Sequence, residues 1–430
     1  MKPESSNGGQ RCHLEKANTD SWQEPPKDVM EMILDQRKVT FDDYLSLCGV
    51  CKPWKQLIKQ TGIHFQLASS PPWLMLPPTS KDDPDLRFFD VETGTIYRFI
   101  NVPEPIRGGQ CCGSSKGWLV IAKDQESIFL YNPVSRVHHR LPPVELLAED
   151  CFDEQKSSYY AIRQHMGRIE LSSSDIHSCT IAAIHARGTK LAICRLNDNT
   201  WTFLKESDEL DLSSANPEDS DCDQHNFEDI LFSEDGHELH VLCGMNNQTY
   251  STVQQDTITL SDNAVINLKL IPNKRTLYWN RLRSMGSTNG FMSITPHLVK
   301  SNNGELLLVE KRTDTLSFDN ESLPYHEANR AKVYKVDESS GELTEVENLG
   351  DQALFVGRTG STSFSWNELE DGERRNLIYF EENLGYFQYL LDSFIVPWIG
   401  EEEGVIPPVW FSADLSPLQC VLHWFSPSLH

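Results

Sequence analysis

Most of this chain alternates between apolar and polar residues with a period of two, in short runs separated by turns. From about residue 72 onward the runs come in groups of three or four, and a group recurs every ~40 to 60 residues. Asp235-Gly236, a dipeptide typical of hairpin turns, separates two of the runs. Groups of short strands at this spacing predict a mainly β fold, a β-propeller of about six blades. A β-sandwich is the alternative that the same pattern leaves open.

The predicted strands can be read directly from the alternation. A strand pair at 86–99 has its turn at Thr93-Gly94. The other predicted strands lie at 117–122, 127–131, 137–141, 179–185, 190–196, 200–204, 230–232, 237–243, 305–311, 332–336, 343–346 and 377–380.

The first part of the chain is patterned differently. Residues 21–66 space their apolar side chains as helices do, in two runs separated by a polar break. The first run begins near Pro26, which suits a first helical turn, and Asp28, which suits the positive end of the helix dipole. The second begins at Asp42 or Asp43, since either can cap a helix. Two helices this short cannot bury all of their apolar side chains, so the segment predicts a protein interface.

These patterns divide the chain into regions. We expect a disordered tail at 1–20, the helical module at 21–66, a Pro-rich linker at 67–78 and the propeller at 79–425. Within the propeller, residues 207–235 carry many carboxylates and no Lys or Arg. Like charges repel one another and stay solvated, so this acidic loop is expected on the surface, with docking of a basic partner as the alternative. The pattern assigns no element after residue 384.

Charge and composition exclude several classes of function. A net charge of −25 is unfavourable for binding nucleic acid or anionic membranes, whose phosphates repel it. No apolar run approaches the roughly 18 residues of a membrane-spanning helix, and the polar N-terminus has no signal peptide. The 11 cysteines have no regular spacing, which is typical of reduced thiols. We therefore expect a nuclear or cytoplasmic protein that binds neither nucleic acid nor membrane.

The helical module resembles an F-box, the short domain that joins a protein to a ubiquitin-ligase scaffold. The pattern Pro-x-Asp-x-x-x-x-Ile-Leu occurs at 26–34 and Val-Cys-Lys-x-Trp at 50–54. The resemblance implies contact with a Skp-type adaptor, and the residues that we expect to make this contact are Pro26, Val29, Met30, Ile33, Leu34, Leu45, Val50, Cys51 and Trp54.

Two prolines depart from the F-box pattern. Pro25 stands where these domains usually have Leu, and Pro53 lies within the predicted second helix. Proline inside a helix removes a backbone hydrogen bond and kinks the helix. We therefore expect the adaptor to bind this module more weakly than usual.

The strand-rich region resembles the plant F-box β-propeller family that includes the KIB proteins. Three sets of segments carry the resemblance: 113–119 continuing to 129–133 and 141–143, then 333–337 leading to 349–357, and finally 376–380. The resemblance implies the substrate-recognition subunit of an SCF-type E3 ubiquitin ligase, in which the F-box binds the adaptor and cullin scaffold and the propeller binds a protein substrate. Some KIB relatives act on glycogen-synthase-kinase-type kinases, so a kinase is one candidate substrate. No catalytic residue, cofactor or metal is expected.

Two other classes of function stay open. One is a ligase-independent binding protein whose F-box has decayed, and the other is a propeller enzyme with inward-facing His and acidic groups in its channel. Residues 113–117 match the Gly-x-Ser-x-Gly elbow of hydrolases, but that elbow requires a helix after the Ser. A strand is predicted there, which favours a tight turn.

Metal binding is also disfavoured by the spacing of the candidate ligands. His237 and His240 are three residues apart on a predicted strand and so point to opposite faces. The pairs His138/His139, Cys111/Cys112 and Cys48/Cys51 lack the second pair that a structural zinc site needs.

Overall fold

The computed structural model describes residues 28, 32, 47, 50–60, 71–76, 83–124, 126–144, 166–185, 190–204, 227–244, 254–260, 264–273, 290–316, 325–357, 360–365, 375–380, 392–393, 395–396, 409–410 and 423–427. The chain divides into two compact units, Met1–Ser69 and Ser70–His430. No helix among the described residues has both the length and the apolar character to cross a membrane.

The described part of unit 1 is helical. Residues 28, 32, 47 and 50 have helical backbone, and α3 spans Lys52–Gln60. Cys51, between the helical residue 50 and α3, is not helical. Pro53 therefore lies in the first turn of a new helix, where its missing N–H leaves no hydrogen bond unmade. The expectation that Pro53 kinks one continuous helix is wrong.

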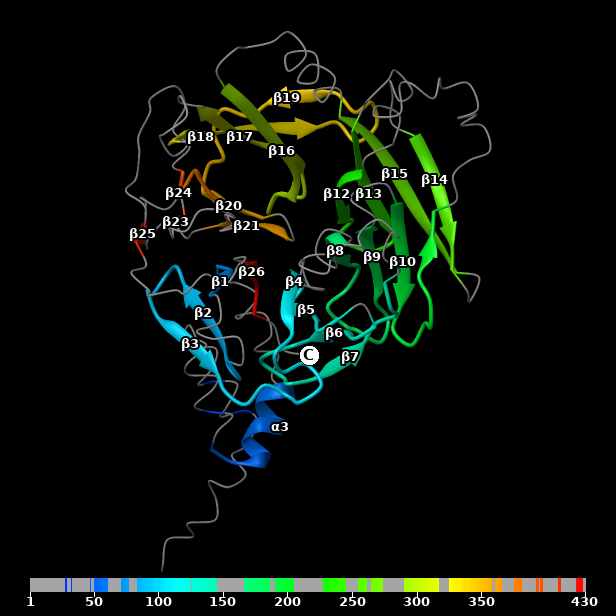
Figure 1. Cartoon of the computed structure of the whole chain (residues 1–430), viewed down its shortest axis with the longest axis vertical. Helices are drawn as coiled ribbons and strands as arrows, with labels where there is room; N and C mark the ends of the chain where they lie inside the picture. The colour runs from blue at the N-terminus through cyan, green and yellow to red at the C-terminus, as the bar shows by residue number, and fades with distance from the viewer. Residues whose placement is uncertain are drawn as a thin grey trace, which may run out of the picture. The chain divides into compact units, whose positions relative to one another are not determined.

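Unit 2 contains six four-stranded sheets, which are the blades of a β-propeller (Figure 1). Blade 1 has β1 (Trp73–Leu76), β2 (Leu86–Asp90), β3 (Ile96–Phe99) and β26 (His423–Phe425). Blade 2 has β4 (Gln110–Ser115), β5 (Trp118–Ala122), β6 (Ile128–Tyr131) and β7 (His138–Arg140). Blade 3 has β8 (Met166–Leu171), β9 (Thr180–His185), β10 (Lys190–Arg195) and β11 (Thr202–Phe203).

The other three blades follow in chain order. Blade 4 has β12 (Phe227–Phe232), β13 (Glu238–Gly244), β14 (Gln254–Thr259) and β15 (Val265–Asn273). Blade 5 has β16 (Gly290–Lys300), β17 (Leu306–Leu316), β18 (Tyr325–Val336) and β19 (Leu343–Glu345). Blade 6 has β20 (Gln352–Val356), β21 (Ser361–Ser365), β22 (Leu377–Phe380) and β24 (Ile395–Val396). A small separate sheet pairs β23 (Asp392–Ser393) with β25 (Val409–Trp410).

One strand of each blade lies at the axis of the propeller. These inner strands are β26, β4, β8, β12, β16 and β21, and each from β26 to β16 contacts the next in this order. The prediction of a propeller with six blades is confirmed, and the β-sandwich alternative is wrong.

Blades 4 and 6 depart from the simple up-and-down order. In blade 4, β13 pairs in parallel with β15, which places β14 on the outer edge. In blade 6 the chain enters at β20, moves inward to β21, and returns to pair β22 in parallel with β20. The apolar–polar alternation of the strands is unaffected by this change of order, because it depends on the geometry of each strand and not on the order of strands in the sheet.

Blade 1 is completed by both ends of unit 2. β1 pairs with β2 on one side and with β26 on the other, so that Trp73 lies opposite Phe425. Aromatic contact stabilises the pairing of β1 with β26, since the Phe425 ring lies 4.8 Å from the ring of the buried Phe88. β1 falls within residues 67–78, where a linker was expected, so its four residues belong to the sheet. β26 likewise gives a structural role to the end of the unassigned region after residue 384.

Apolar side chains fill the space between neighbouring blades. Trp118 of blade 2 packs with Ile181 of blade 3, and Val241 of blade 4 packs in one cluster with Ile193 of blade 3. Phe355 of blade 6 stacks on Tyr379 at 4.5 Å and meets Trp424 of blade 1 edge-on at 5.0 Å. Each such large side chain contributes about 1.5 to 3 kcal/mol when buried, so these layers stabilise the ring.

A turn of the same geometry joins the two outermost strands of blades 1, 2 and 5. It spans Asp90–Thr95, Asn132–Val137 and Asp337–Glu342, and in each case the first residue's N–H bonds the last residue's carbonyl at 2.9 Å. The side chain of the first residue accepts a hydrogen bond at 2.8 Å from a backbone N–H further along the turn. The fifth residue has a left-handed backbone: Gly94 and Gly341 have φ of 70°, and Arg136 has φ of 62°. Arg136 is thus the exception, because glycine adopts this backbone without strain.

Candidate functional site

A group of charged side chains is buried at the propeller axis. Arg168 on the inner strand β8 is 2% exposed, and its Nε lies 3.1 Å from Oδ1 of Asp229 on β12. Its Nη1 donates to the carbonyl of Gly357 at 3.3 Å and to Oγ of Ser361 at 3.5 Å, both in blade 6. One guanidinium therefore connects blades 3, 4 and 6. We call Arg168, Glu170, Asp229 and His297 the axial cluster.

Asp229 extends the axial cluster to blade 5. Its Oδ2 accepts a hydrogen bond from the N–H of Leu298 on β16 at 2.6 Å, and its Oδ1 accepts one from the N–H of Ile230 at 2.8 Å. Burial raises the pKa of Asp229, while Arg168 lowers it. Asp229 was counted in the acidic loop at 207–235, and there the prediction is wrong: residues 227–232 are an inner strand. Residues 207–226 lie outside the described residues.

The other carboxylate of the cluster, Glu170, faces the same guanidinium at a greater distance. Its Oε2 lies 3.9 Å from Nη2 of Arg168. Burial raises the pKa of Glu170 although Arg168 and Lys116 oppose this. One guanidinium thus faces two buried carboxylates, and its charge offsets part of the cost of burying each of them.

His297 on β16 completes the cluster as a neutral group. Burial lowers the pKa of His297 to about 3, and the positive charges of Arg168 and Lys311 act in the same direction. At neutral pH the imidazole is therefore uncharged.

The axial cluster has the residue types that a propeller enzyme would need in its channel. Its side chains are not accessible to a substrate, however. All four side chains are less than 9% exposed. Their polar groups face one another and the backbone of neighbouring blades, so no acid–base pair among them is presented to a substrate. The arrangement holds four blades together, and the sequence missed it because Arg168 and Glu170 lie on a strand that alternation did not reveal.

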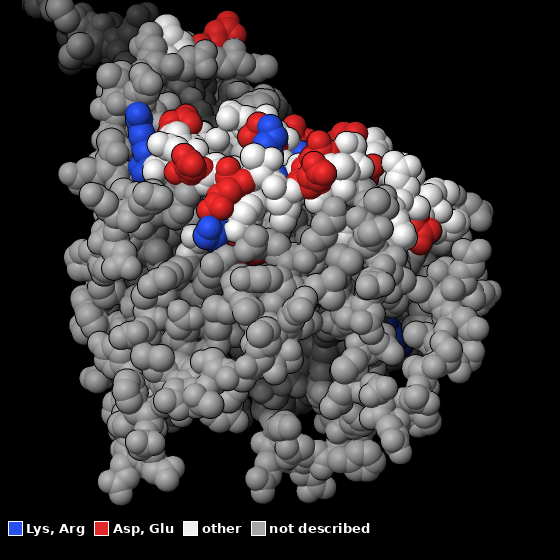
Figure 2. Space-filling model, turned by 90° about the horizontal axis from the view of Figure 1, so that it is seen from above, with Lys and Arg blue, Asp and Glu red and all other residues white. Residues whose placement is uncertain are grey.

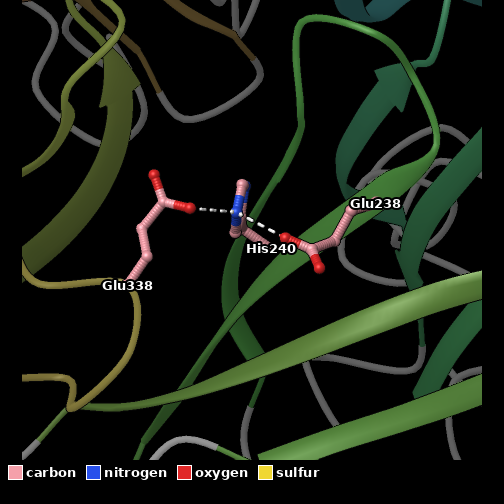
Figure 3. A group of neighbouring side chains, drawn as sticks. All are labelled: Glu238, His240 and Glu338. Atoms are coloured by element: carbon pink, nitrogen blue, oxygen red, sulfur yellow. Dashed lines mark hydrogen bonds and ion pairs between the residues drawn. The ribbon is translucent and has the colours of Figure 1, made fainter.

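A second charged group joins blades 4 and 5 (Figure 3). His240 on β13 lies between two carboxylates, with Nε2 3.1 Å from Oε2 of Glu338 and 3.2 Å from Oε1 of Glu238. Glu338 comes from the turn after β18, and the other two residues from β13. This geometry would suit a divalent cation, since the three ligand atoms lie within 4.8 Å of one another.

Two lysines bind the same carboxylates. Nζ of Lys269 lies 2.9 Å from Glu238 and 3.2 Å from Glu338, and Nζ of Lys300 lies 3.3 Å from Glu338. Burial opposes the charge of Lys269, but the hydrogen bonds that Lys269 donates to Glu238 and Glu338 raise its pKa overall. Burial lowers the pKa of His240, although Glu338 and Glu238 oppose this. The ammonium groups supply the positive charge that a metal would bring, so this group is an ion-pair network between blades.

The remaining candidates from the sequence have structural roles. Lys116 and Gly117, with φ of 46° and 82°, form the two-residue turn between β4 and β5. Two positive φ values identify a hairpin turn and exclude the nucleophile elbow, as predicted. Ser115 Oγ accepts a hydrogen bond from the N–H of Leu171, and Ser114 Oγ donates to the carbonyl of Trp424. These hydroxyls thus tie blade 2 to blades 3 and 1.

The histidine and cysteine candidates are dispersed. The His139 ring lies 5.8 Å from Trp118 and 6.1 Å from His177, and burial lowers its pKa. Cys111 and Cys112 are buried on β4, at an irregularity in its pairing with β5. Cys51 is half-buried, and Cys48 lies outside the described residues.

Three of the expected adaptor-binding residues are described. Val50 is 57% exposed, and Cys51 and Trp54 are half-buried. Met32, on the first predicted helix, is 53% exposed. Pro26, Val29, Met30, Ile33, Leu34 and Leu45 lie outside the described residues.

Comparison with known proteins decides the family. The KIB1-4 β-propeller family model matches residues 88–404, which include all of blades 2 to 6. This chain belongs to the KIB1-4 β-propeller family. The resemblance inferred from residues 113–143, 333–357 and 376–380 is confirmed for the propeller.

Two other similarities are more limited. An F-box/kelch-repeat protein of Arabidopsis thaliana is 32% identical over 102 residues, covering 22% of this chain and 24% of that protein. The chain thus matches about a quarter of the length of this curated relative. The Cps50 (Swd1) β-propeller domain of Myceliophteria thermophila covers 65% of this chain and 85% of its own, at 12% identity and a TM-score of 0.26. A TM-score this low supports no inference about the function of this chain.

Proposed function

We propose that this protein is the substrate-recognition subunit of an SCF-type E3 ubiquitin ligase. The propeller is a protein-binding domain of the KIB family, and the helical module is an F-box that binds a Skp-type adaptor and, through it, the cullin scaffold. The limited similarity to an F-box/kelch-repeat protein supports this reading. The proposed site of action is the nucleus or cytoplasm.

The observation that carries the proposal is the exposure of large apolar residues in unit 1. Met32 and Val50 each expose more than half of their side chain. Large apolar side chains in a small helical module stabilise little when they face water, whereas each contributes about 1.5 to 3 kcal/mol when a partner covers it. The F-box pattern at 26–34 and 50–54 supports a Skp-type adaptor as that partner.

The mechanism is recruitment without catalysis by this chain. Binding of a protein substrate to the propeller holds a substrate lysine near the charged ubiquitin-conjugating enzyme. Tethering raises their effective concentration, so the transfer becomes nearly intramolecular. The buried and mutually paired axial cluster agrees with a propeller that binds proteins and performs no chemistry itself. A kinase is one substrate class that family membership suggests.

The proposal is tested by copurification of the full chain with a Skp-type adaptor. Val50→Asp and Trp54→Ala place a charge on, or remove the largest side chain from, the proposed interface, and each should abolish copurification. Gln56→Ala, at an exposed polar position of α3, is the matched control and should bind as the wild type does. If the wild-type chain does not bind the adaptor, the protein is a ligase-independent binding propeller with a decayed F-box.

A further inference from the structure

The two buried carboxyl groups of the axial cluster have unequal surroundings. Asp229 accepts backbone hydrogen bonds from Leu298 at 2.6 Å and from Ile230 at 2.8 Å. Nε of Arg168 also lies 3.1 Å from its Oδ1. For Glu170 the ion pair is longer, since Nη2 of Arg168 lies 3.9 Å from Oε2, beyond the length of a hydrogen bond. The donors that favour a negative charge are therefore concentrated on Asp229.

The single guanidinium of the cluster is also engaged with other groups. Besides its ion pair with Asp229, Arg168 binds blade 6. Its Nη1 donates to the carbonyl of Gly357 at 3.3 Å and to Oγ of Ser361 at 3.5 Å. His297 adds no positive charge at neutral pH, because burial lowers its pKa to about 3. If both carboxyl groups were ionised, one cation would face two buried anions.

The elements packed against Glu170 add little that stabilises its charged form. On β9 its register partner is the apolar Ala182. On the side of blade 2, the Ser115 hydroxyl can donate to a carboxylate or accept from a carboxylic acid. Lys116, in the turn after Ser115, is only half-buried, so solvent screens its positive charge. Asp229 on β12 contributes a negative charge that opposes ionisation.

Glu170 differs in this respect from the carboxylates at the surface. Acidic side chains are numerous among the described residues on the face shown in Figure 2, where water solvates them. Glu345, at the edge of blade 5, is 51% exposed and pairs with Lys332 at 2.7 Å. Glu170 is 7% exposed, and its burial raises its pKa. A charged Glu170 would lack the hydration that stabilises carboxylates at the surface.

We infer that Glu170 keeps its proton at neutral pH and that its ionisation in alkaline solution releases the contact of Arg168 with blade 6. A charged Glu170 attracts the guanidinium, and both bonds from Arg168 to blade 6 are long, so little opposes their loss. The axial cluster is then a pH-sensitive contact between the opposite blades 3 and 6. The inference is independent of the proposed function, because it concerns the ring alone.

The effect of this proton on stability has a defined sign. The folded chain holds the proton at pH values where an unfolded glutamate, with a pKa of about 4.3, has lost it. Stability relative to a chain without this acid therefore falls as the pH rises above about 4.3. In this window the folding equilibrium constant changes by up to about tenfold per pH unit.

The first test compares the full chain with Glu170→Gln, which has the shape of the neutral acid and cannot ionise. Urea unfolding between pH 5 and 9 should give a difference that grows with pH in favour of E170Q. Glu345→Gln is the matched control at the surface, and its difference from the wild type should stay constant over this range. Equal pH dependence of the wild type and E170Q would overturn the inference.

Infrared spectroscopy observes the proton directly. At pH 7 the wild-type spectrum should contain the C=O band of a buried carboxylic acid, and this band should be missing in E170Q. The band should decline as the wild-type chain is titrated to pH 9, a measurement that needs no variant to fold. The inference fails if the wild type has no such band at pH 7, if E170Q keeps it, or if it persists unchanged at pH 9.

Hydrogen exchange locates the consequence of ionisation. At pH 9 the amides at 353–357 and 361–365 in blade 6 should exchange faster in the wild type than in E170Q, whereas at pH 6 the two chains should be alike. The amides at 128–131 in blade 2 are the internal control and should not differ between the chains. Equal exchange in blade 6 at both pH values would contradict the release of Arg168.

Discussion

The inner and outer strands of this propeller differ in the environment of their side chains. Inner strands such as β8 and β12 meet at the axis, where Arg168 and Asp229 are buried and must find partners in other blades. Outer strands such as β3 and β14 have exposed residues, although Tyr97 of β3 still stacks on the buried Trp73 at 4.4 Å. Comparison of the two shows that the centre of the ring determines whether the propeller closes, while its rim is available for recognition.

Removal of the inner strand β26 should destabilise the propeller more than any other change considered. Without residues 421–430, β1 keeps β2 but loses its other partner strand, β26, and blade 1 loses Trp424 and Phe425. Each buried aromatic contributes up to about 3 kcal/mol, and the open ring also exposes a strand edge. We expect loss of cooperative thermal unfolding by circular dichroism. Deletion of 428–430 alone, which leaves β26 in place, is the control, and equal behaviour of the two deletions would contradict this role for β26.

Replacement of Arg168 should be the most damaging single change at the axis. Arg168→Met leaves Asp229 and Glu170 buried without their cation and should cost about 3 to 5 kcal/mol. Lys332→Met removes an ion pair of 2.7 Å to Glu345 whose side chains are 40% and 51% exposed, and it should cost less than about 1 kcal/mol. Urea unfolding measures both. Similar losses in the two variants would show that burial at the axis does not matter.

His297 should make stability depend on pH in a defined direction. Its pKa in the folded protein is about 3, below the value of about 6.5 in an unfolded chain. The unfolded state therefore binds a proton first, and folding stability falls as the pH drops below about 6.5 toward 3. His297→Gln should flatten this part of the profile.

The comparison with His297→Gln is needed because other groups titrate nearby. His139 and His240 also have lowered pKa values and act in the same sense. Glu170 and Asp229 have raised pKa values, so they favour the folded state at low pH and oppose the effect there. Unfolding midpoints of wild type and variant between pH 5 and 7 isolate the His297 contribution, and parallel profiles would refute it.

Substitutions in the shared turn should have smaller effects on stability, and these should differ between Gly94 and Arg136. Gly94→Ala meets no atom within 4 Å, so its cost is the backbone strain alone, about 1 to 2 kcal/mol. Arg136→Gly relieves the same strain and should leave stability within about 1 kcal/mol of wild type, since it also loses the bond to Ile100. Chemical denaturation with unchanged m-values checks both. Destabilisation by Arg136→Gly greater than that by Gly94→Ala would show that Arg136 is structural.

Alternation in the sequence predicted many of the middle and outer strands and few of the inner ones, although it also missed β1, β14, β15, β20 and β24. β5, β6, β9 and β10 lie where the period of two placed them. β4, β8, β16 and β21 were not predicted, because they carry groups such as Ser115, Arg168, Glu170 and His297 that bind other blades instead of filling an apolar face. An apolar pattern cannot reveal a strand whose inward side chains are polar.

The axial cluster could not be predicted from the sequence for a related reason. Arg168 and Asp229 come from different blades, and the register that brings them to 3.1 Å depends on closure of the ring. The repeated turn, by contrast, could have been found: an Asp or Asn followed four residues later by Gly, or by Arg136, between two strands marks it in three blades. The F-box pattern stays a prediction for the residues outside the described part of the chain.

The pairing of β1 with β26 also bears on how the protein is made. During synthesis β1 emerges before the other five blades, with Trp73 and Leu74 ready for burial, but β26 emerges only after those five blades have been translated. Contacts between such distant residues form slowly. Ring closure therefore follows the synthesis of all six blades. A chain that terminates before β26 presents an incomplete first blade, which chaperones and proteases can distinguish from the closed propeller.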